Sequence, residues 1–178
     1  MKFQIVLLCL FFLVELNATP FYFKSYDMED GLSNNHVTCC VQDDYGFMWF
    51  GTRDGLNRFD SKKFYTFKSY SSEKGSLMSS YILDLAKSPT GQIWVSTNLG
   101  LQKYDYQTDS FTLIDFTKGI NCYSLQFDQQ GNLWMILNGY SLVKYNESQG
   151  MHLNYMYKGS DPITVFWGLF SEGVCGVA

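Results

Sequence analysis

Two adjacent carboxylates, Asp43 and Asp44, are the residues of this sequence whose type and spacing first suggest chemistry. Paired carboxylates are what most glycosidases use. This pair, however, falls in a turn position that recurs along the chain, where aspartate commonly caps the backbone. A sialidase-like reaction would also need an arginine cluster for the substrate carboxylate, and only Arg53 and Arg58 exist. We therefore interpret the pair as structural and predict no catalytic residue.

The other reactive side chains form no recognisable site either. His36 and His152 lie in strand-like or pre-strand contexts, which does not suit a phosphoacceptor on a helix. The sequence contains neither a Ser-His-Asp arrangement nor a glycine-rich phosphate loop. It therefore predicts neither a cofactor nor a metal site.

Five cysteines are present, and the first, Cys9, lies in a predicted export signal. The spacing of the others matches no zinc pattern. We interpret them as small buried apolar side chains. A disulfide from Cys39 or Cys40 to Cys122 is possible in an oxidising compartment, and the sequence does not decide it. The four are Cys39, Cys40, Cys122 and Cys175.

Composition favours a packed all-β chain outside the nucleic-acid-binding class. Hydrophobic residues make up 46% and charged residues 17% of the sequence, which is enough apolar material for a core. Aromatic residues reach 18%, and they favour strands. The net charge is -4 with no basic patch, so neither a nucleic acid nor a polybasic membrane contact is predicted.

Internal repetition is the strongest signal in the sequence. Three segments read Gly-x-apolar-Trp, followed by a short apolar run, a turn and a stretch that ends in an aromatic residue. Their tryptophans lie 45 and 40 residues apart, which matches the period of a four-stranded propeller blade. The repeated structural residues are Gly46, Trp49, Gly91, Trp94, Gly131 and Trp134. We expect each tryptophan to pack between neighbouring blades, with its N–H bonded.

Each repeat divides into four strands joined by tight turns. The second strand carries the tryptophan, and the third ends in Phe59, Tyr104 or Tyr145. The predicted first strands are 37–41, 82–86 and 123–127, and the predicted fourth strands are 64–68, 111–115 and 151–156. The turn after the third tryptophan strand is irregular, because Ile136 and Leu137 stand where the other repeats have a small residue and a threonine.

The domain prediction follows from these repeats. Residues 1–18 read as a signal peptide, with a basic start and an apolar run too short to span a bilayer. Residues 21–158 are predicted to form three blades, with repeats at about 32–70, 77–116 and 120–157. Residues 23–26 repeat residues 67–70, which predicts an isolated outer strand. Residues 159–178 read as an aborted fourth blade, so we expect an incomplete ring and association through its open sheet edges.

The repeat resembles the two-component regulator propeller repeat. The likeness spans Phe21 to about Lys158, and its clearest stretches are 30–35, 42–52 and 54–60. The third repeat departs from the pattern at Ile136 and Leu137. This resemblance implies an all-β propeller in the periplasmic sensor region of a hybrid two-component regulator.

The same resemblance implies a function for the longer protein. Such sensors often respond to oligosaccharides, and a histidine kinase follows their membrane span. No kinase motif is present here, so the chain is predicted to be a non-enzymatic, exported sensor fragment. Its partners would be an oligosaccharide and the missing blades, and no ligand-binding residue can be assigned. The alternatives are a fragment of a secreted sialidase-like propeller glycosidase and a generic protein-interaction propeller.

Overall fold

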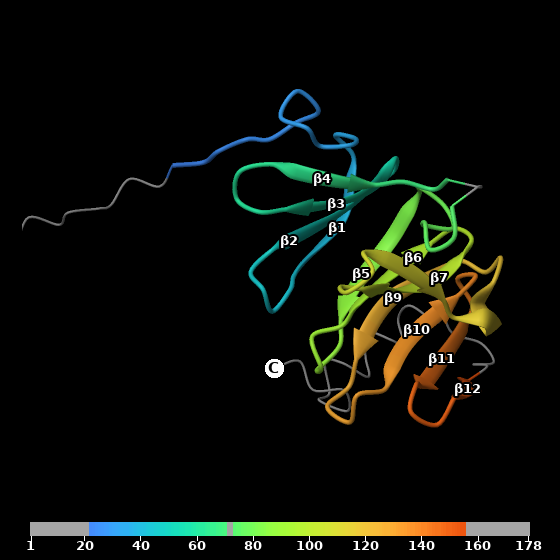
Figure 1. Ribbon diagram of the computed structural model, residues 1–178. Helices are drawn as coiled ribbons and strands as arrows, with labels where there is room; N and C mark the ends of the chain where they lie inside the picture. The colour runs from blue at the N-terminus through green and yellow to red at the C-terminus, as the bar shows by residue number, and fades with distance from the viewer. Residues whose placement is uncertain (1–21, 71–72, 156–178) are drawn as a thin grey trace, which may run out of the picture.

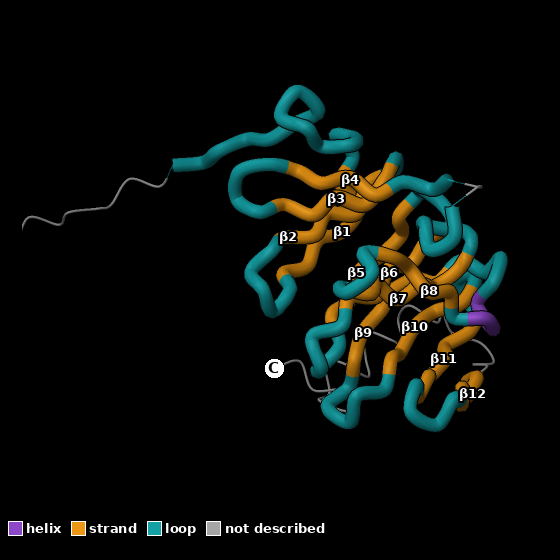
Figure 2. Tube along the Cα trace, viewed as in Figure 1, coloured by secondary structure: helices purple, strands orange, loops and turns teal. Residues whose placement is uncertain are grey.

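The computed structural model describes residues 22–70 and 73–155 of the chain. The predicted signal peptide (1–18) and the predicted aborted blade (159–178) lie outside these residues. The described part is built from β-strands and one short 3-10 helix, η1, at Asp115–Thr117 (Figure 2). The predicted all-β class is confirmed.

The strands form three four-stranded antiparallel sheets that follow one another in chain order (Figure 1). Within each sheet, strands adjacent in sequence are adjacent in space. We call the sheets blades 1, 2 and 3. Blade 1 contains β1 (Val37–Gln42), β2 (Met48–Thr52), β3 (Gly55–Phe59) and β4 (Phe64–Phe67). Blade 2 contains β5 (Ile82–Lys87), β6 (Ile93–Thr97), β7 (Gly100–Asp105) and β8 (Ser110–Leu113). Blade 3 contains β9 (Cys122–Phe127), β10 (Leu133–Leu137), β11 (Ser141–Asn146) and β12 (Met151–Tyr155).

The turn between the first and second strands of each blade depends on its glycine. Gly46, Gly91 and Gly131 have φ of 88°, 81° and 79°, which side chains with a Cβ rarely adopt. In each turn the glycine N–H donates to the carbonyl oxygen of the residue three positions earlier. The three glycines therefore end these turns in a conformation that suits a residue without a Cβ.

The turn between the second and third strands differs in blade 3, as its sequence indicates. In blades 1 and 2, Thr52 and Thr97 donate their hydroxyls to the carbonyls of Gly55 and Gly100, at 2.8 and 3.1 Å, and close two-residue hairpins. Leu137 offers no hydroxyl in blade 3. The loop there spans residues 138–140 between paired Leu137 and Ser141.

Residues 23–26 form no strand with the described sheets, each of which already has its fourth strand. The strand predicted there was expected to be isolated, and its pairing with another blade stays a prediction. One other predicted strand is too long. The fourth strand of blade 2 ends at Leu113 rather than at residue 115. The chain turns there into η1, where the Thr117 hydroxyl donates to the carbonyl of Ile114 at 2.7 Å and accepts from the N–H of Leu101 at 2.9 Å.

The longer link between blades 1 and 2 covers a sheet edge. The N–H of Phe111, on the outer strand β8, donates to the carbonyl of Gly75 at 2.7 Å. Gly75 lies so close to Ser110 that an added Cβ would approach the Ser110 Cβ within 2.8 Å. The extra residues that lengthen the first spacing therefore protect an otherwise open edge.

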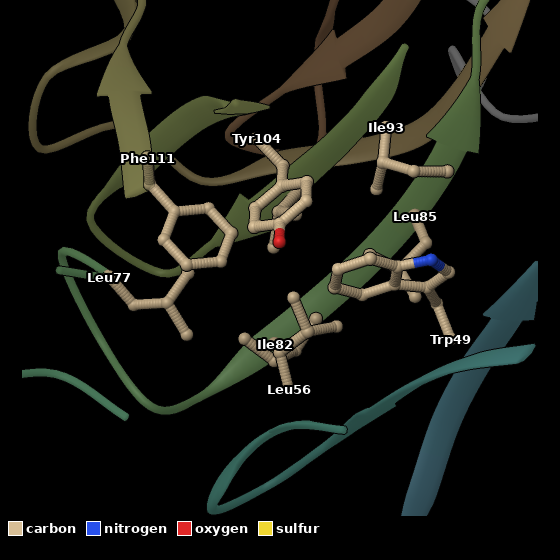
Figure 3. Packing of buried hydrophobic residues seen from close by; sticks show 9 residues of the cluster. Trp49, Leu56, Leu77, Ile82, Leu85, Ile93, Tyr104 and Phe111 are labelled. Carbon is tan, nitrogen blue, oxygen red and sulfur yellow. The ribbon is translucent and has the colours of Figure 1, made fainter. Parts of the chain in front are cut away.

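The core lies between blades rather than within them. One cluster joins Trp49 and Leu56 of blade 1 to Ile82, Leu85 and other residues of blade 2 (Figure 3). A second cluster joins Trp94 and Leu101 of blade 2 to Leu125, Leu133 and Met135 of blade 3. In blades 1 and 2, the face of the sheet that carries the tryptophan thus covers the opposite face of the next sheet.

Small residues let the blades approach closely. Gly51 on β2 lies against Ile82 of the next blade, where an added Cβ would stand 2.6 Å from the Ile82 Cγ2. Ser96 occupies the matching place on β6 and donates its hydroxyl to the carbonyl of Cys122. Ile136 stands at this place in blade 3 and is fully buried.

Candidate functional site

The repeated tryptophans lie on the second strands, as predicted, and the turn before each strand determines how its indole is held. Trp49 is fully buried and donates its Nε1–H to the Asp43 carboxylate at 2.8 Å. Trp134 does the same to Asp128 at 3.0 Å. The other oxygen of each carboxylate accepts two backbone N–H groups of its own turn. These aspartates therefore lock turn and indole together.

Blade 2 breaks this pattern. Ser88 stands where the other blades have aspartate, and its hydroxyl bonds the Thr90 hydroxyl at 2.8 Å and the N–H of Gln92 at 3.0 Å. Trp94 is 1% exposed, and its Nε1 has no hydrogen-bond partner among the described residues. The prediction that every indole N–H is bonded is therefore wrong for Trp94. An alignment of the three turns shows serine in place of aspartate, so the missing acceptor could have been predicted from the sequence.

A cation on the third strand lies over each of the three indoles. The cross-strand partners of Trp49, Trp94 and Trp134 are a basic residue in every case. The distances from the cation to the ring centroid are 5.6, 5.9 and 5.2 Å, within the range of cation–π attraction. The three cations are Arg58, Lys103 and Lys144.

Asp128 of blade 3 is held by several hydrogen bonds and by one ion pair. Its burial raises the pKa of the carboxyl, but hydrogen bonds from Trp134 and Asn132 and the charge of Lys144 outweigh burial and hold the pKa below its ordinary value. The Lys144 Nζ lies 3.6 Å from the carboxylate. Asp128 is therefore ionised at neutral pH, with a structural role.

The candidate binding site is a hollow of about 740 Å³ at the end of the blades that carries the glycine turns. It lies where the turns of blades 1 and 2 meet the end of β9 and the turn after it. Its wall combines an aromatic ring and a proline with amide, hydroxyl and carboxylate groups. The lining residues are Asp44, Ala86, Lys87, Ser88, Pro89, Leu125, Gln126, Phe127, Asp128 and Gln129.

Asp44 and Lys87 join two blades at the edge of this hollow, since the Lys87 Nζ lies 2.5 Å from the Asp44 carboxylate. The adjacent carboxylates of the predicted pair thus have separate partners, because Asp43 holds Trp49 and Asp44 holds Lys87. Sequence reasoning gave Asp43 a structural role but missed this ion pair. Its partners are 43 positions apart in sequence.

The remaining reactive groups do not converge. Among the described residues, no group of three His, Cys, Asp or Glu side chains is placed to hold a metal ion. Cys39, Cys40 and Cys122 are free thiols. Burial raises the pKa of the Cys39 and Cys122 thiols to about 12, which keeps them protonated. No helix in residues 22–70 and 73–155 is long and apolar enough to cross a membrane.

Part of the first repeat matches a known protein family. The model of a family described as "Two component regulator propeller" matches residues 31–54, which run from the loop before β1 through the first glycine turn to the end of the tryptophan strand. Residues 31–54 therefore match the two-component regulator propeller repeat. The same repeat geometry recurs in blades 2 and 3, where Trp94 and Trp134 occupy the place of Trp49.

A histidine kinase and two solved extracellular domains resemble the chain in sequence or in fold. Histidine kinase P4 of Formosa agariphila is 46% identical over 67 residues, which cover 36% of this chain and 5% of that protein. The solved extracellular domain described as that of the hybrid two component system BT3049 of B. thetaiotaomicron superposes with a TM-score of 0.68 at 28% identity, over 77% of this chain and 20% of that one. The corresponding domain of BT4673 superposes with a TM-score of 0.63 at 21% identity, over 76% of this chain and 18% of that one. This likeness supports the fold.

The chain therefore spans about a twentieth of the curated relative and about a fifth of the solved extracellular domains. It is a propeller fragment that resembles the extracellular domains of hybrid two-component sensors. The kinase activity in the relative's name belongs to that protein.

Proposed function

We propose that this chain is the ligand-sensing part of a periplasmic two-component sensor that binds oligosaccharides and performs no catalysis itself. The observation that carries the proposal is the likeness to extracellular domains of hybrid two-component systems, together with the hollow at the glycine turns. Export through the predicted signal peptide (1–18) belongs to the same proposal.

The wall of the hollow suits an uncharged polar ligand. Phe127 offers an apolar surface, while Gln126 and Gln129 offer amide donors and acceptors. A few polar groups on a partly apolar wall are typical of small-molecule sites. The acids there are already engaged, because Asp44 holds Lys87 and Asp128 holds Trp134. This arrangement favours binding over acid–base chemistry.

The test is a titration of the 178-residue chain with neutral oligosaccharides, followed by calorimetry. We expect binding that weakens when Gln126 and Gln129 are both replaced by alanine. Tyr140→Ala is the control, since Tyr140 is 69% exposed in the turn between β10 and β11, at the other end of the blades. Chromatography should recover the oligosaccharide unchanged. Absence of binding to any oligosaccharide would refute the proposed ligand, and cleavage would refute the sensor-only role.

We further propose that another blade of the same repeat type packs on the open face of blade 1. That face holds an apolar hollow of about 220 Å³ lined by Leu32, Val37, Phe50, Phe59, Phe64 and Tyr26. Five of these six match residues of blade 2 that blade 1 covers. The matching residues are Leu77, Ile82, Val95, Tyr104 and Phe111. Tyr26 stacks edge-on against Phe59 at 4.9 Å, much as Trp49 meets Tyr104 at 4.8 Å.

Sedimentation of the chain tests this contact, because a second molecule can supply the partner blade. We expect association that rises with concentration and is abolished by Phe50→Asp, which places a charge on the apolar face. Tyr140→Asp, at an exposed position away from this face, is the matched control. A strictly monomeric wild-type chain at all concentrations would refute the contact.

A further inference from the structure

A smaller hollow of about 230 Å³ lies where the β1–β2 turn meets blade 2. Blade 1 contributes Asp44 and Tyr45 to its wall, and blade 2 contributes Gly91, Gln92 and Tyr106 among others. Asp44 also lines the larger hollow, so the two are neighbours at the same end of the blades.

Tyr45 forms a supported but open aromatic surface in this hollow. Its side chain is 71% exposed, yet its ring rests on Tyr106 with centroids 4.9 Å apart and planes inclined by 54°. Tyr106 is fixed in turn, because its hydroxyl donates to the buried Asp43 carboxylate at 3.0 Å. A tyrosine held in this way offers a flat apolar face together with a polar edge, which is the pattern of an aromatic contact surface.

Two of the polar groups beside Tyr45, on Asp44 and Gln92, can accept hydrogen bonds from a ligand. Lys87 holds one oxygen of the Asp44 carboxylate, Oδ1, at 2.5 Å. The other oxygen, Oδ2, lies over Gly91 so closely that any Cβ there would collide with it. Gln92 donates its Nε2 to the Tyr104 carbonyl, which leaves its own carbonyl oxygen as an acceptor. A ligand that enters this hollow can therefore donate hydrogen bonds to both groups.

We propose that this hollow binds a single pyranose ring, whose apolar face stacks on Tyr45 while two adjacent hydroxyls donate to the Asp44 carboxylate. A charged acceptor strengthens such hydrogen bonds. The volume lies below the range of about 300–1,000 Å³ that drug-sized ligands need, so it suits one ring. This proposal rests on the proposed oligosaccharide function and assigns one sugar unit of that ligand to a subsite.

The test uses saturation-transfer NMR on the 178-residue chain with methyl glucoside, galactoside and mannoside as probes. We expect at least one probe to bind, and Tyr45→Ala to weaken it by about tenfold or more, the loss that removal of a stacking contact worth about 1.4 kcal/mol would give. Asp44→Asn should weaken it as well, since the acceptor loses its charge. Tyr140→Ala, the exposed tyrosine at the other end of the blades, should change nothing.

The outcomes separate this subsite from the function on which it rests. Tyr45 is mostly exposed, so its replacement should leave the melting temperature unchanged and the variant remains interpretable. Oligosaccharide binding that survives Tyr45→Ala would overturn the subsite and leave the proposed function standing. Failure of the wild-type chain to bind any saccharide would overturn both. Binding of glucosamine far above the neutral probes, lost in Asp44→Asn, would overturn the diol contact in favour of an ammonium group.

Discussion

Restoring the missing carboxylate in blade 2 should stabilise the protein. Ser88→Asp places an acceptor where Asp43 and Asp128 hold the indoles of the other blades. Trp94 Nε1–H is buried without a described partner, and an unsatisfied buried donor costs about 1–3 kcal/mol. A hydrogen bond to a charged acceptor contributes about 1.5–3 kcal/mol. The substitution gives up the Ser88–Thr90 bond, worth about 0.5–1.5 kcal/mol, and partly buries a carboxylate.

The net gain should be about 1 kcal/mol. In a domain of this size such a gain raises the melting temperature by about 2–4 °C. Urea unfolding should show a higher midpoint with an unchanged slope, because the change adds a bond and exposes no new surface on unfolding. Glu147 stands in blade 3 where Tyr106, the partner of Asp43, stands in blade 2. The Glu147 carboxylate pairs with Lys103, the cation over Trp94, so the charge that it presents to a new carboxylate is already partly balanced.

A double-mutant cycle with Trp94→Phe decides whether the gain comes from the indole. Phenylalanine keeps an aromatic ring but has no N–H, so Ser88→Asp should give no gain in that background. Asp128→Ser, the reverse change in blade 3, should cost about 1–3 kcal/mol. An equal gain from Ser88→Asp with and without the indole N–H, or no gain at all, would refute the reasoning.

Three further predictions follow from the turns, the thiols and the buried acid. Gly91→Ala should lower the free energy of unfolding by more than Gly131→Ala in urea titrations, since both have positive φ but only the first collides with a carboxylate of the neighbouring blade. Iodoacetamide at pH 8 should modify the exposed Cys40 and spare Cys122, whose pKa of about 12 keeps it protonated. Mass spectrometry would measure the order of modification, and modification of Cys122 before Cys40 would contradict this prediction. The lowered pKa of Asp128 stabilises the fold fully above the unfolded value of 3.8, and this stability is lost as the pH falls through the folded pKa. Asp128→Asn should therefore flatten the dependence of stability on pH below about 4, which acid titration by circular dichroism would measure.

The sequence predicted what repeats along the chain. Three copies of Gly-x-apolar-Trp fixed the strand order, the glycine turns and the burial of Trp49 and Trp94, because period and alternation are local properties. Residues 23–26 resemble residues 67–70, but similarity alone does not supply the neighbour that a strand needs, and none of the described sheets pairs with them.

The candidate site was harder to predict, because its parts come from different blades. Asp44 and Lys87 lie 43 positions apart, and nothing in either stretch indicates that they pair. The contact between Tyr45 and Tyr106 joins residues that are even farther apart in sequence. Such contacts depend on how two sheets stack, which the repeat period does not specify. The serine at position 88 was visible in an alignment of the turns, but its effect on Trp94 needed the geometry.

The side chain at one position of the second strand sets how steeply successive blades can lean together. Glycine at 51 and serine at 96 are small residues near the inner strands, and they let the neighbouring sheets approach closely. Isoleucine at 136 is larger. A sheet stacked on that side of blade 3 must therefore lie farther away, by roughly the width of the side chain, or tilt away from it. The angle between blades governs how many blades complete a ring. Exchanging small and large residues at this position therefore offers evolution, and the protein engineer, a way to change the circumference of the ring.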